Sequence, residues 1–329
     1  MHAVQVLKPG PPETLVIDEL PDLQPGAGEV LIDIQAAAVN YPDLLVITGR
    51  YQSSPALPFT PGKEAAGIVR AIGPGVTRVQ VGARVLAHLD HGGFATQCIA
   101  PEAHCFPLPE AMGFVDAVGL GLAAQTAWFA LFERGHLQGG ETVLITGASG
   151  AVGQAAAQIA HGHGCTVLAA ASNLPRAQGL LEGTPCHFVD LGVPNLRDGL
   201  RQQVHATTHG KGADVVIDTL GGDVFDASLR ALAWCGRIVT VGFAAGRIPE
   251  VKANYLLVKN IAASGLQWTD YLERQPQRVA QAHDDLTALW TRGVLRPQVM
   301  HTFALRDIAQ ALTLIDMRRA EGRLVLTMA

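Results

Sequence analysis

The apolar residues of this chain follow two different patterns. In the first third, short apolar runs alternate with turns rich in glycine and proline, which predicts β-strands joined by tight connections. We expect these strands at residues 4–7, 15–19, 30–38, 66–72, 84–87 and 94–99. The pattern predicts a β-rich, barrel-like domain at the amino-terminal end.

From residue 142 the apolar runs recur at longer intervals, separated by segments long enough for helices. They lie at residues 142–146, 166–171, 187–191, 213–220, 237–243 and 261–267. Nearly continuous apolar strands that alternate with crossover helices are typical of a parallel sheet covered on both faces. The middle of the chain is therefore predicted to be an α/β domain of the Rossmann type, with a doubly wound parallel sheet.

After Trp268 the pattern becomes helical again, at residues 277–292 and 305–318, and a last apolar run covers residues 323–327. Such a tail is too small to bury a core of its own, so it should complete the first domain. We expect a β-rich domain at 1–118, a Rossmann domain at 119–268 and a completing segment at 269–329.

The most informative motif is the run TVLITGASGAVG at residues 142–153, in which a strand leads into a glycine-rich turn and then a helix. Gly147, Gly150 and Gly153 let a pyrophosphate approach the backbone, and the first amides of the helix, at Ala151 and Val152, favour its charge. The spacing is GxxGxxG rather than GxGxxG, so a glycine-rich helix start without a nucleotide is the alternative. The six predicted strands around the turn favour a dinucleotide site.

Composition excludes several classes of protein. The 329 residues carry a net charge of −5 and no basic runs, which argues against nucleic acid or an anionic membrane as a partner. We see neither a secretory signal nor a membrane-spanning run, so a cytoplasmic location is expected. The five cysteines are scattered and show no CxxC spacing, which is typical of reduced thiols.

One group of residues could suggest a metal site. It consists of His88, His91, Cys98, His104 and Cys105. Structural zinc sites have four ligands in close pairs, and this group lacks that spacing. We interpret these residues as strand ends and surface positions, and we expect no metal.

Several motifs, in this order, resemble those of one known family. They are NYPD at 40–43, PGKEAAG at 61–67, GPGV at 73–76, GGFA at 92–95, AAQT at 123–126, the glycine turn, DTLGG at 218–222, and the segments 236–246 and 256–260. The chain resembles the zinc-independent medium-chain dehydrogenases/reductases, in the quinone oxidoreductase branch. The resemblance implies a GroES-like catalytic domain beside the Rossmann domain, with NADPH and substrate bound between them.

Departures from the zinc-dependent relatives imply a reaction without metal. Asn40 stands where those relatives have a cysteine ligand, and Lys63 stands where they have a histidine. A charged lysine has no lone pair with which to bind zinc. The cysteine-rich lobe for structural zinc is also missing, and Glu64 is expected to have a structural role.

The end of the second Rossmann strand indicates which nicotinamide cofactor binds. NAD-preferring sites have an acidic residue there that binds the ribose 2′-hydroxyl, but residues 169–176 contain no acid. Ser172 and Asn173 can donate hydrogen bonds to a phosphate, and Arg176 offers a bidentate cation. We therefore predict NADPH rather than NADH, although Arg176 could also be a solvated residue at a helix start.

Further cofactor contacts are implied by the resemblance alone. Thr126 should lie near the nicotinamide amide, and Gly242, Phe243 and Ala244 should line the nicotinamide end; Phe243 could instead be a core residue. Arg318 matches a position that reaches the cofactor. Arg319 and Arg323 are further candidates.

The chemistry requires donors that stabilise negative charge on the oxygen of an acceptor. We predict Asn40, Tyr41 and Tyr51 for this role, since a neutral tyrosine hydroxyl can donate to such an oxygen; Tyr41, beside Pro42, could instead pack at the base of its loop. Acceptors compatible with this site are conjugated carbonyls, namely quinones, enones or enoyl thioesters. The family resemblance favours quinones over an enone or enoyl-thioester reductase.

Two other functions remain as alternatives. The YxxxK spacing of Tyr255 and Lys259 is also typical of a short-chain dehydrogenase. In that family, however, the glycine turn lies near the amino terminus, whereas here a whole β-rich region precedes it. A non-catalytic NADPH-binding sensor is the second alternative. Finally, the strand at 261–267 should lie at a sheet edge, where apolar strands tend to pair, so we expect a homodimer.

Overall fold

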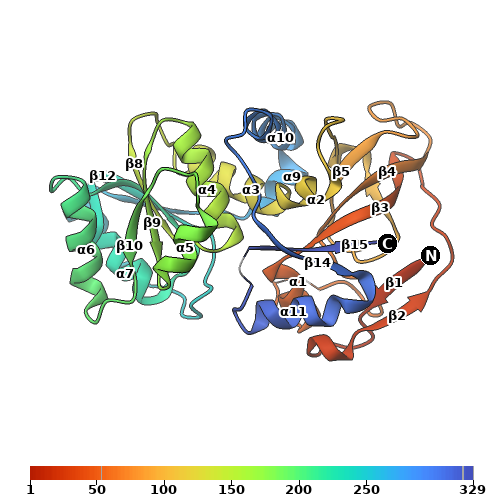
Figure 1. Cartoon of the computed structure of the whole chain (residues 1–329), viewed down its shortest axis with the longest axis horizontal. Helices are drawn as coiled ribbons and strands as arrows, with labels where there is room; N and C mark the ends of the chain where they lie inside the picture. The colour runs from red at the N-terminus through yellow and green to blue at the C-terminus, as the bar shows by residue number, and fades with distance from the viewer. Residues whose placement is uncertain (53, 321, 329) are drawn as a thin grey trace. The chain divides into compact units, whose positions relative to one another are not determined.

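The computed structural model describes residues 1–52, 54–320 and 322–328, and the chain divides into two compact units. The first unit comprises Met1–Leu122 and Pro297–Ala329, and the second comprises Ala123–Arg296. Each unit has its own large sheet, and both are drawn in Figure 1. None of the described helices is long and apolar enough to cross a membrane.

The first unit contains a seven-stranded, mostly antiparallel sheet in the order β14-β15-β3-β4-β5-β7, with β6 also paired to β3. A separate hairpin joins β1 to β2. The strands are β1 (His2–Gln5), β2 (Val16–Glu19), β3 (Glu29–Val39), β4 (Glu64–Ile72), β5 (Arg84–His88), β6 (Gln97–Pro101), β7 (Cys105–Pro107), β14 (Val299–Ala304) and β15 (Arg323–Thr327). The β-rich, GroES-like domain expected from the sequence is confirmed.

Two strands of this sheet, β7 and β14, are not apparent from the hydrophobic pattern. The first is only three residues long and ends at Pro107, and the second carries His301 and Thr302 on an exposed edge. Neither segment shows a clear alternation of apolar and polar residues, so only pairing with β5 and β15 defines them.

Short helices close the core of the first unit. They are η1 (Pro12–Thr14), α1 (Tyr41–Ile47), η2 (Glu102–His104), α2 (Phe114–Gly119), η4 (Leu305–Asp307) and α11 (Ile308–Asp316). Ile32 and Ile34 of β3 share one core with Leu44 of α1 and Leu312 of α11. Burial of these side chains supplies the main stabilisation of the unit, at about 1.5–3 kcal/mol for each large apolar residue.

The second unit is a six-stranded parallel sheet in the order β10-β9-β8-β11-β12-β13. The strands are β8 (Thr142–Thr146), β9 (Thr166–Ala171), β10 (His187–Asp190), β11 (Ala213–Asp218), β12 (Leu232–Thr240) and β13 (Ala262–Gly265). All neighbouring pairs are parallel, so the doubly wound sheet predicted from the apolar runs is confirmed. β13 lies at one edge of the sheet, as expected.

Helices precede, connect and follow these strands along the chain. They are α3 (Leu122–Trp128), η3 (Phe129–Arg134), α4 (Ala151–Gly162), α5 (Leu174–Leu180), α6 (Leu196–Thr207), α7 (Gly222–Ala231), α8 (Ala253–Lys259), α9 (Trp268–Arg274) and α10 (Pro276–Thr291). In Figure 1, α6 lies on one side of the strands and α4 on the other. From β8 the sheet grows in one direction through β9 and β10, and from β11 it grows in the opposite direction through β12 and β13. The switch point, where doubly wound sheets bind ligands, therefore lies between β8 and β11.

Several strands differ by a few residues from their expected bounds, and β12 differs most. β12 begins at Leu232 rather than at residue 237 and ends at Thr240 rather than at residue 243. It starts early because it includes Trp234 and Cys235, two exposed residues at an irregularity in the strand where Cys235 has a φ of 61°. The early end leaves residues 242–244 in the loop at the carboxyl edge of the sheet.

The division into units also differs from the expected domains. Residues 269–296 belong to the second unit instead of completing the first. The reason is local packing: Gln125 Nε2 donates to the carbonyl of Val279 at 3.2 Å, and Trp128 Nε1 donates to Asp285 at 3.1 Å. These bonds attach α10 to α3, so only the part from Pro297 onward joins the first unit.

Candidate functional site

The glycine turn after β8 can form only because Gly147 and Gly153 lack side chains. Gly147 has a φ of 68°, and a Cβ at this position would overlap with Thr219 Oγ1. A Cβ on Gly153 would overlap with the carbonyl oxygen of Gly147. The turn therefore packs directly on the first helical turn of α4, as in known pyrophosphate-binding turns.

The first amides of α4 are available for a ligand. Gln154 N donates to the carbonyl of Gly150 at 2.9 Å, which is the first bond of the helix. The amides of Ala151, Val152 and Gly153 precede that bond and have no acceptor within α4. Together with the helix dipole they form a partly positive surface, which fits the pyrophosphate of a dinucleotide.

A buried carboxylate braces this turn against the neighbouring strand. Asp218, at the end of β11, is fully buried; its Oδ1 accepts a hydrogen bond from Thr146 Oγ1 at 2.6 Å, and its Oδ2 accepts one from Gly221 N at 2.9 Å. Thr219 Oγ1 donates back to the carbonyl of Thr146 at 2.9 Å. Burial raises the pKa of Asp218, although the bonds from Thr146, Gly221 and Leu220 oppose this. The two loops at the switch point are thus held as one piece.

The loop after β12 lies on the same edge of the sheet. Ala244 N donates to the carbonyl of Thr219 at 3.2 Å, and Ala245 N donates to that of Leu220 at 2.9 Å. The structure therefore brings Gly242, Phe243 and Ala244 beside the braced turn. Phe243 is 41% exposed, so it is not a core residue as one interpretation of the sequence allowed.

The predicted phosphate-binding residues lie at the end of β9, next to the glycine turn. Ala148 N donates to the carbonyl of Ala170 at 3.0 Å, which fixes the turn beside this strand. Ser172 is exposed and Arg176 is half-buried in the first turn of α5. Asn173 Oδ1 accepts a hydrogen bond from Arg176 N at 3.1 Å, so part of the Asn173 amide caps α5. Thr126 is half-buried in α3.

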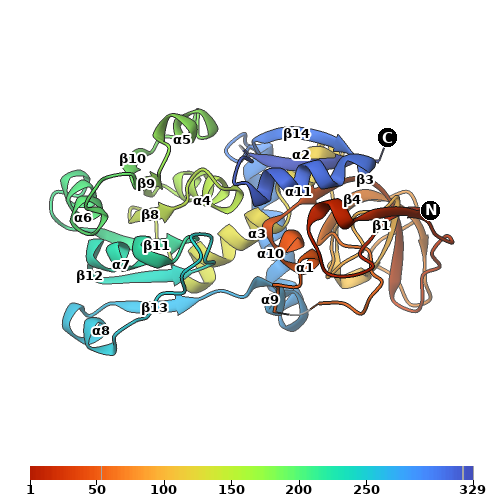
Figure 2. The ribbon, with the colours of Figure 1, turned by 90° about the horizontal axis from the view of Figure 1, so that it is seen from below.

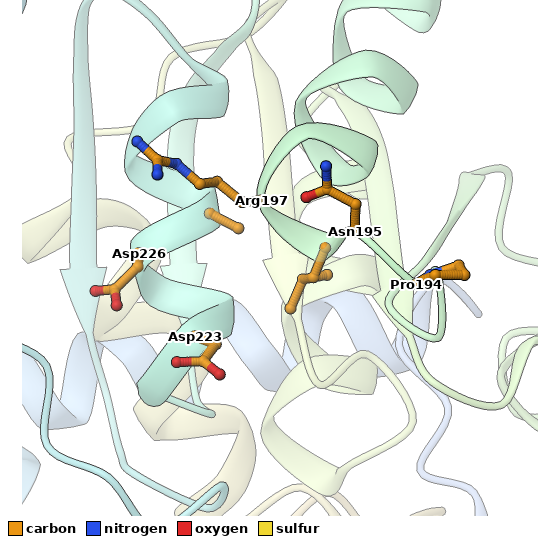
Figure 3. Close-up of a pocket in the computed structure, with 7 residues that line it drawn as sticks. Pro194, Asn195, Arg197, Asp223 and Asp226 are labelled. Atoms are coloured by element: carbon orange, nitrogen blue, oxygen red, sulfur yellow. The ribbon is translucent and has the colours of Figure 1, made fainter.

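A pocket of about 370 Å³ lies between the first turns of α6 and α7, and Figure 3 shows its lining. None of the predicted cofactor residues lines it. Asp223 and Asp226 form part of its wall, and both carboxylates bind Arg247. The pocket lies apart from the glycine turn, none of whose residues lines it, so it does not replace the site at the switch point.

The structure also bears on the short-chain dehydrogenase alternative. Lys259 Nζ donates to the carbonyls of Leu229 at 2.9 Å and Arg230 at 3.2 Å, at the end of α7. The ammonium of Lys259 is therefore used to cap α7, and burial lowers its pKa. A lysine occupied in this way is not arranged to activate Tyr255.

In the first unit, the predicted donor Asn40 belongs to a buried polar cluster. Its Nδ2 donates to Glu64 Oε1 at 2.9 Å, and its Oδ1 accepts from Arg323 at 2.8 Å. Arg323 also binds Glu64 at 2.8 Å and the carbonyl of Val118 at 2.9 Å. Glu64 thus makes the structural bonds expected of it. The side chain of Asn40 is committed to this cluster, which differs from the donor role expected for it.

Asp43 lies next to this cluster at the first turn of α1. Its Oδ2 accepts a hydrogen bond from Asn40 N at 2.8 Å. Burial raises the pKa of Asp43 from 3.8 to about 7, whereas the bond from Asn40 and the positive charge of Lys63 lower it. A carboxyl group that is only partly ionised at pH 7 therefore lies within a few residues of the predicted donors.

The other predicted residues of the first unit differ in exposure. Tyr41, the first residue of α1, is 47% exposed, which disagrees with tight packing at the loop base. Tyr51 is half-buried, and the ammonium of Lys63 lies 4.9 Å from its ring centroid. Arg318 is exposed with a φ of 57°, whereas Arg323 is buried in the cluster with Glu64.

The sequence analysis did not predict Asp218, Asp43 or the contact between Lys63 and Tyr51 as parts of the site, although two of these features have a sequence signal. Asp218 has a recognisable signal, because an acid at the end of a buried strand needs partners. The spacing of Asn40 and Asp43 is also the sequence signal of a helix cap. By contrast, the contact between Lys63 and Tyr51 joins residues on different segments and gives no local signal. Among the residues described, no three His, Cys, Asp or Glu side chains are grouped as for a metal ion.

Both parts of the chain match known protein families. The model of the alcohol dehydrogenase GroES-like domain matches residues 26–129, and that of the zinc-binding dehydrogenase matches residues 151–287. Quinone oxidoreductase-like protein 2 of Rattus norvegicus is 34% identical over 317 residues, which cover 96% of this chain and 89% of the relative.

Solved structures are similar over nearly the whole chain. The quinone oxidoreductase of Escherichia coli, complexed with NADPH, has a TM-score of 0.91 at 25% identity and covers 99% of this chain and 100% of its own. A mycobacterial protein complexed with NADPH has a TM-score of 0.91 at 28% identity, with 99% and 100% covered.

The buried carboxyl of Asp43 predicts a pH-dependent stability. Its pKa is higher in the folded protein than in the unfolded chain, so the folded state binds more protons between about pH 4 and 7 and this group destabilises it as pH rises. We expect the free energy of unfolding of Asp43→Asn, relative to wild type, to rise by about 2–3 kcal/mol between pH 5 and pH 8. Urea unfolding at both pH values measures this.

The exposed Asp18→Asn serves as the control, and its difference from wild type should change by less than about 0.5 kcal/mol. If the free energy of unfolding of Asp43→Asn relative to wild type is the same at pH 5 and pH 8, the carboxyl of Asp43 is charged at both pH values in the folded protein, which would contradict the prediction.

Proposed function

The chain belongs to the medium-chain dehydrogenase/reductase superfamily, in its quinone oxidoreductase branch, and from this premise we propose that it is an NADPH-dependent reductase of quinones or related conjugated carbonyl compounds. The observation that carries the proposal is the braced glycine turn at the switch point of the parallel sheet. When bound there, NADPH supplies the hydride that reduces the acceptor.

Residues of the second unit would bind the cofactor. The amides of Ala151, Val152 and Gly153 would hold the pyrophosphate, and Ser172 and Arg176 would bind the 2′-phosphate of NADPH. Support for the phosphate comes from charge: residues 169–176 contain no acid that would repel it, and they contain one arginine. Thr126 and residues 242–244 would line the nicotinamide end, and Arg318 of the first unit is a further candidate.

Residues of the first unit would serve the acceptor. Tyr41 and Tyr51 would donate hydrogen bonds to the oxygen on which negative charge develops, and one of them would supply the proton. Asn40, whose amide is held by Glu64 and Arg323, would position α1 and thereby Tyr41. No metal is needed in this scheme, and the charged Lys63 offers no lone pair to one.

Two alternatives fit parts of the same site. An enone or enoyl-thioester reductase would use the same donors, because hydride addition to such acceptors also leaves negative charge delocalised onto oxygen. A sensor would bind NADPH without reducing anything. Relatives that are named quinone oxidoreductases favour the quinone.

The proposed function predicts that the purified protein oxidises NADPH when 1,2- or 1,4-quinones or small enones are added, and that a chelator does not slow it. Replacing the proton donor, Tyr51→Phe or Tyr41→Phe, should lower kcat about 10²-fold or more with an NADPH Kd within about twofold of wild type. Absorbance of the reduced nicotinamide measures the turnover.

The matched control is Tyr255→Phe on α8, which should retain turnover, whereas its loss would support a short-chain dehydrogenase. Binding of NADPH without turnover of any acceptor would identify a sensor. Faster enoyl-thioester reduction than quinone reduction would favour the thioester reductase.

The proposed phosphate contact predicts a cofactor preference. NADPH should bind more tightly than NADH, and Arg176→Gln should raise the Kd of NADPH about 10- to 100-fold, the effect of one lost hydrogen bond to a charged group. The Kd of NADH should change little. The control is the exposed Arg197→Gln in the first turn of α6; equal affinities of wild type for both cofactors would contradict the proposal.

We further propose that the protein is a homodimer formed through the edge of the parallel sheet. β13 has no strand neighbour on its outer side among the described strands, and α8 lies at the same end of the sheet in Figure 2. Leu257 and Val258 of α8 are 79% and 77% exposed, which is unusual for two adjacent large apolar residues.

Light scattering should therefore give the mass of a dimer at micromolar concentration. The double variant Leu257→Asp with Val258→Asp should be monomeric, because two charges would have to be buried in the interface. Val81→Asp, at an exposed apolar residue of the first unit, is the control and should remain a dimer. A monomeric wild type would refute this assembly.

A further inference from the structure

Lys63 immediately precedes β4, and its ammonium lies beside a tyrosine. Its Nζ lies 4.9 Å from the ring centroid of Tyr51 and donates to the carbonyl of Asp90 at 3.2 Å. A cation at this distance from an aromatic face is attracted by the ring. These contacts hold the ammonium next to Tyr51, which is one of the two proposed donors to the acceptor oxygen.

The carboxylates near Lys63 in the sequence do not form an ion pair with its ammonium. Glu64, the next residue, turns inward and pairs with Arg323. Asp43 is buried and interacts with the charge of Lys63, but burial raises its pKa to about 7, so it carries only part of a negative charge at neutral pH. Asp90 is in contact with the ammonium through its backbone carbonyl. Within residues 1–52, 54–320 and 322–328, Lys63 forms no ion pair with a carboxylate.

The neighbouring cation Arg50 has a different environment. It precedes Tyr51 in the chain, but its guanidinium lies 3.8 Å from Asp316 and its Nε donates to Thr48 Oγ1 at 2.9 Å. The charge of Arg50 is therefore shared with a carboxylate. Of these two cations, Lys63 is the one whose ammonium lies over the ring of Tyr51, and Arg50 is the one in contact with a carboxylate.

We propose that Lys63 determines acceptor specificity, by selecting conjugated carbonyl compounds that carry an anionic substituent such as a sulfonate or carboxylate. This inference rests on the proposed function, because it places the acceptor beside Tyr51. An acceptor whose oxygen binds the Tyr51 hydroxyl would bring a ring substituent within a few ångströms of the ammonium. A negative charge there gains an attraction that a neutral acceptor lacks.

The test compares 1,2-naphthoquinone with 1,2-naphthoquinone-4-sulfonate. For each variant the ratio of kcat/KM for the sulfonate to that for the parent quinone is measured, so that differences in intrinsic reactivity cancel between variants. We expect Lys63→Met, which keeps the length of the side chain but loses its charge, to lower this ratio about tenfold. Lys63→Arg should keep it, since the charge remains.

The salt dependence of this ratio distinguishes an electrostatic role of Lys63 from a purely structural one. Raising ionic strength from about 0.05 to about 0.5 M should lower the ratio of the wild type and leave that of Lys63→Met unchanged. Arg50→Gln is the matched control, because it removes a cation adjacent to Tyr51 that already has a carboxylate partner. Its ratio should stay within about twofold of wild type.

An unchanged ratio in Lys63→Met, or an equal loss in Arg50→Gln, would overturn the assignment. If the wild type reduces neither quinone, the proposed function fails, and equilibrium binding of 2-naphthalenesulfonate then decides the role of Lys63. A dissociation constant about tenfold higher in Lys63→Met than in wild type would support an anion-selecting role, and equal constants would refute it. If Lys63→Met does not fold, the salt dependence of the wild-type ratio and of Lys63→Gln decides instead.

Discussion

The buried ion pair between Glu64 and Arg323 is the contact on which the first unit depends. It joins β4 to β15 across 259 residues of sequence, and the same two side chains bind Asn40 and the end of α2. Leu122 N donates to the second oxygen of Glu64 at 2.6 Å, and Gly121 leaves the space for that oxygen because any Cβ there would overlap with it. Nearly every polar atom of the pair therefore has a partner.

Such a pair is costly to bury and still more costly to break. Removing two charges from water costs several kcal/mol for each ion, and only close geometry and further hydrogen bonds offset this cost, whereas loss of one partner typically destabilises a protein by about 3–5 kcal/mol. The arrangement therefore enforces one conformation of the segments that it joins. It fixes Asn40, and through Asn40 the start of α1 and the position of Tyr41.

The second unit uses a related solution at its own loops. The carboxylate of Asp218 is fully buried and accepts hydrogen bonds from Thr146 and Gly221, so the turn after β8 and the turn after β11 form one rigid edge. A fully satisfied polar network in a low-dielectric interior makes such an edge specific in shape. In both units a buried acid organises the backbone, while the cations and hydroxyls proposed to contact ligands remain nearer the surface.

The sequence by itself determined the main architecture and half of the candidate site. Apolar runs at helix-long intervals specify a parallel sheet, and Gly147 and Gly153 specify a turn, because these are local properties of the chain. The grouping of residues 269–296, the inward role of Asn40 and the pairing of Lys63 with Tyr51 were decided by the tertiary structure. Each depends on contacts between segments far apart in sequence, such as Asn40 with Arg323, and hydrophobic periodicity contains no information about which distant partners will meet.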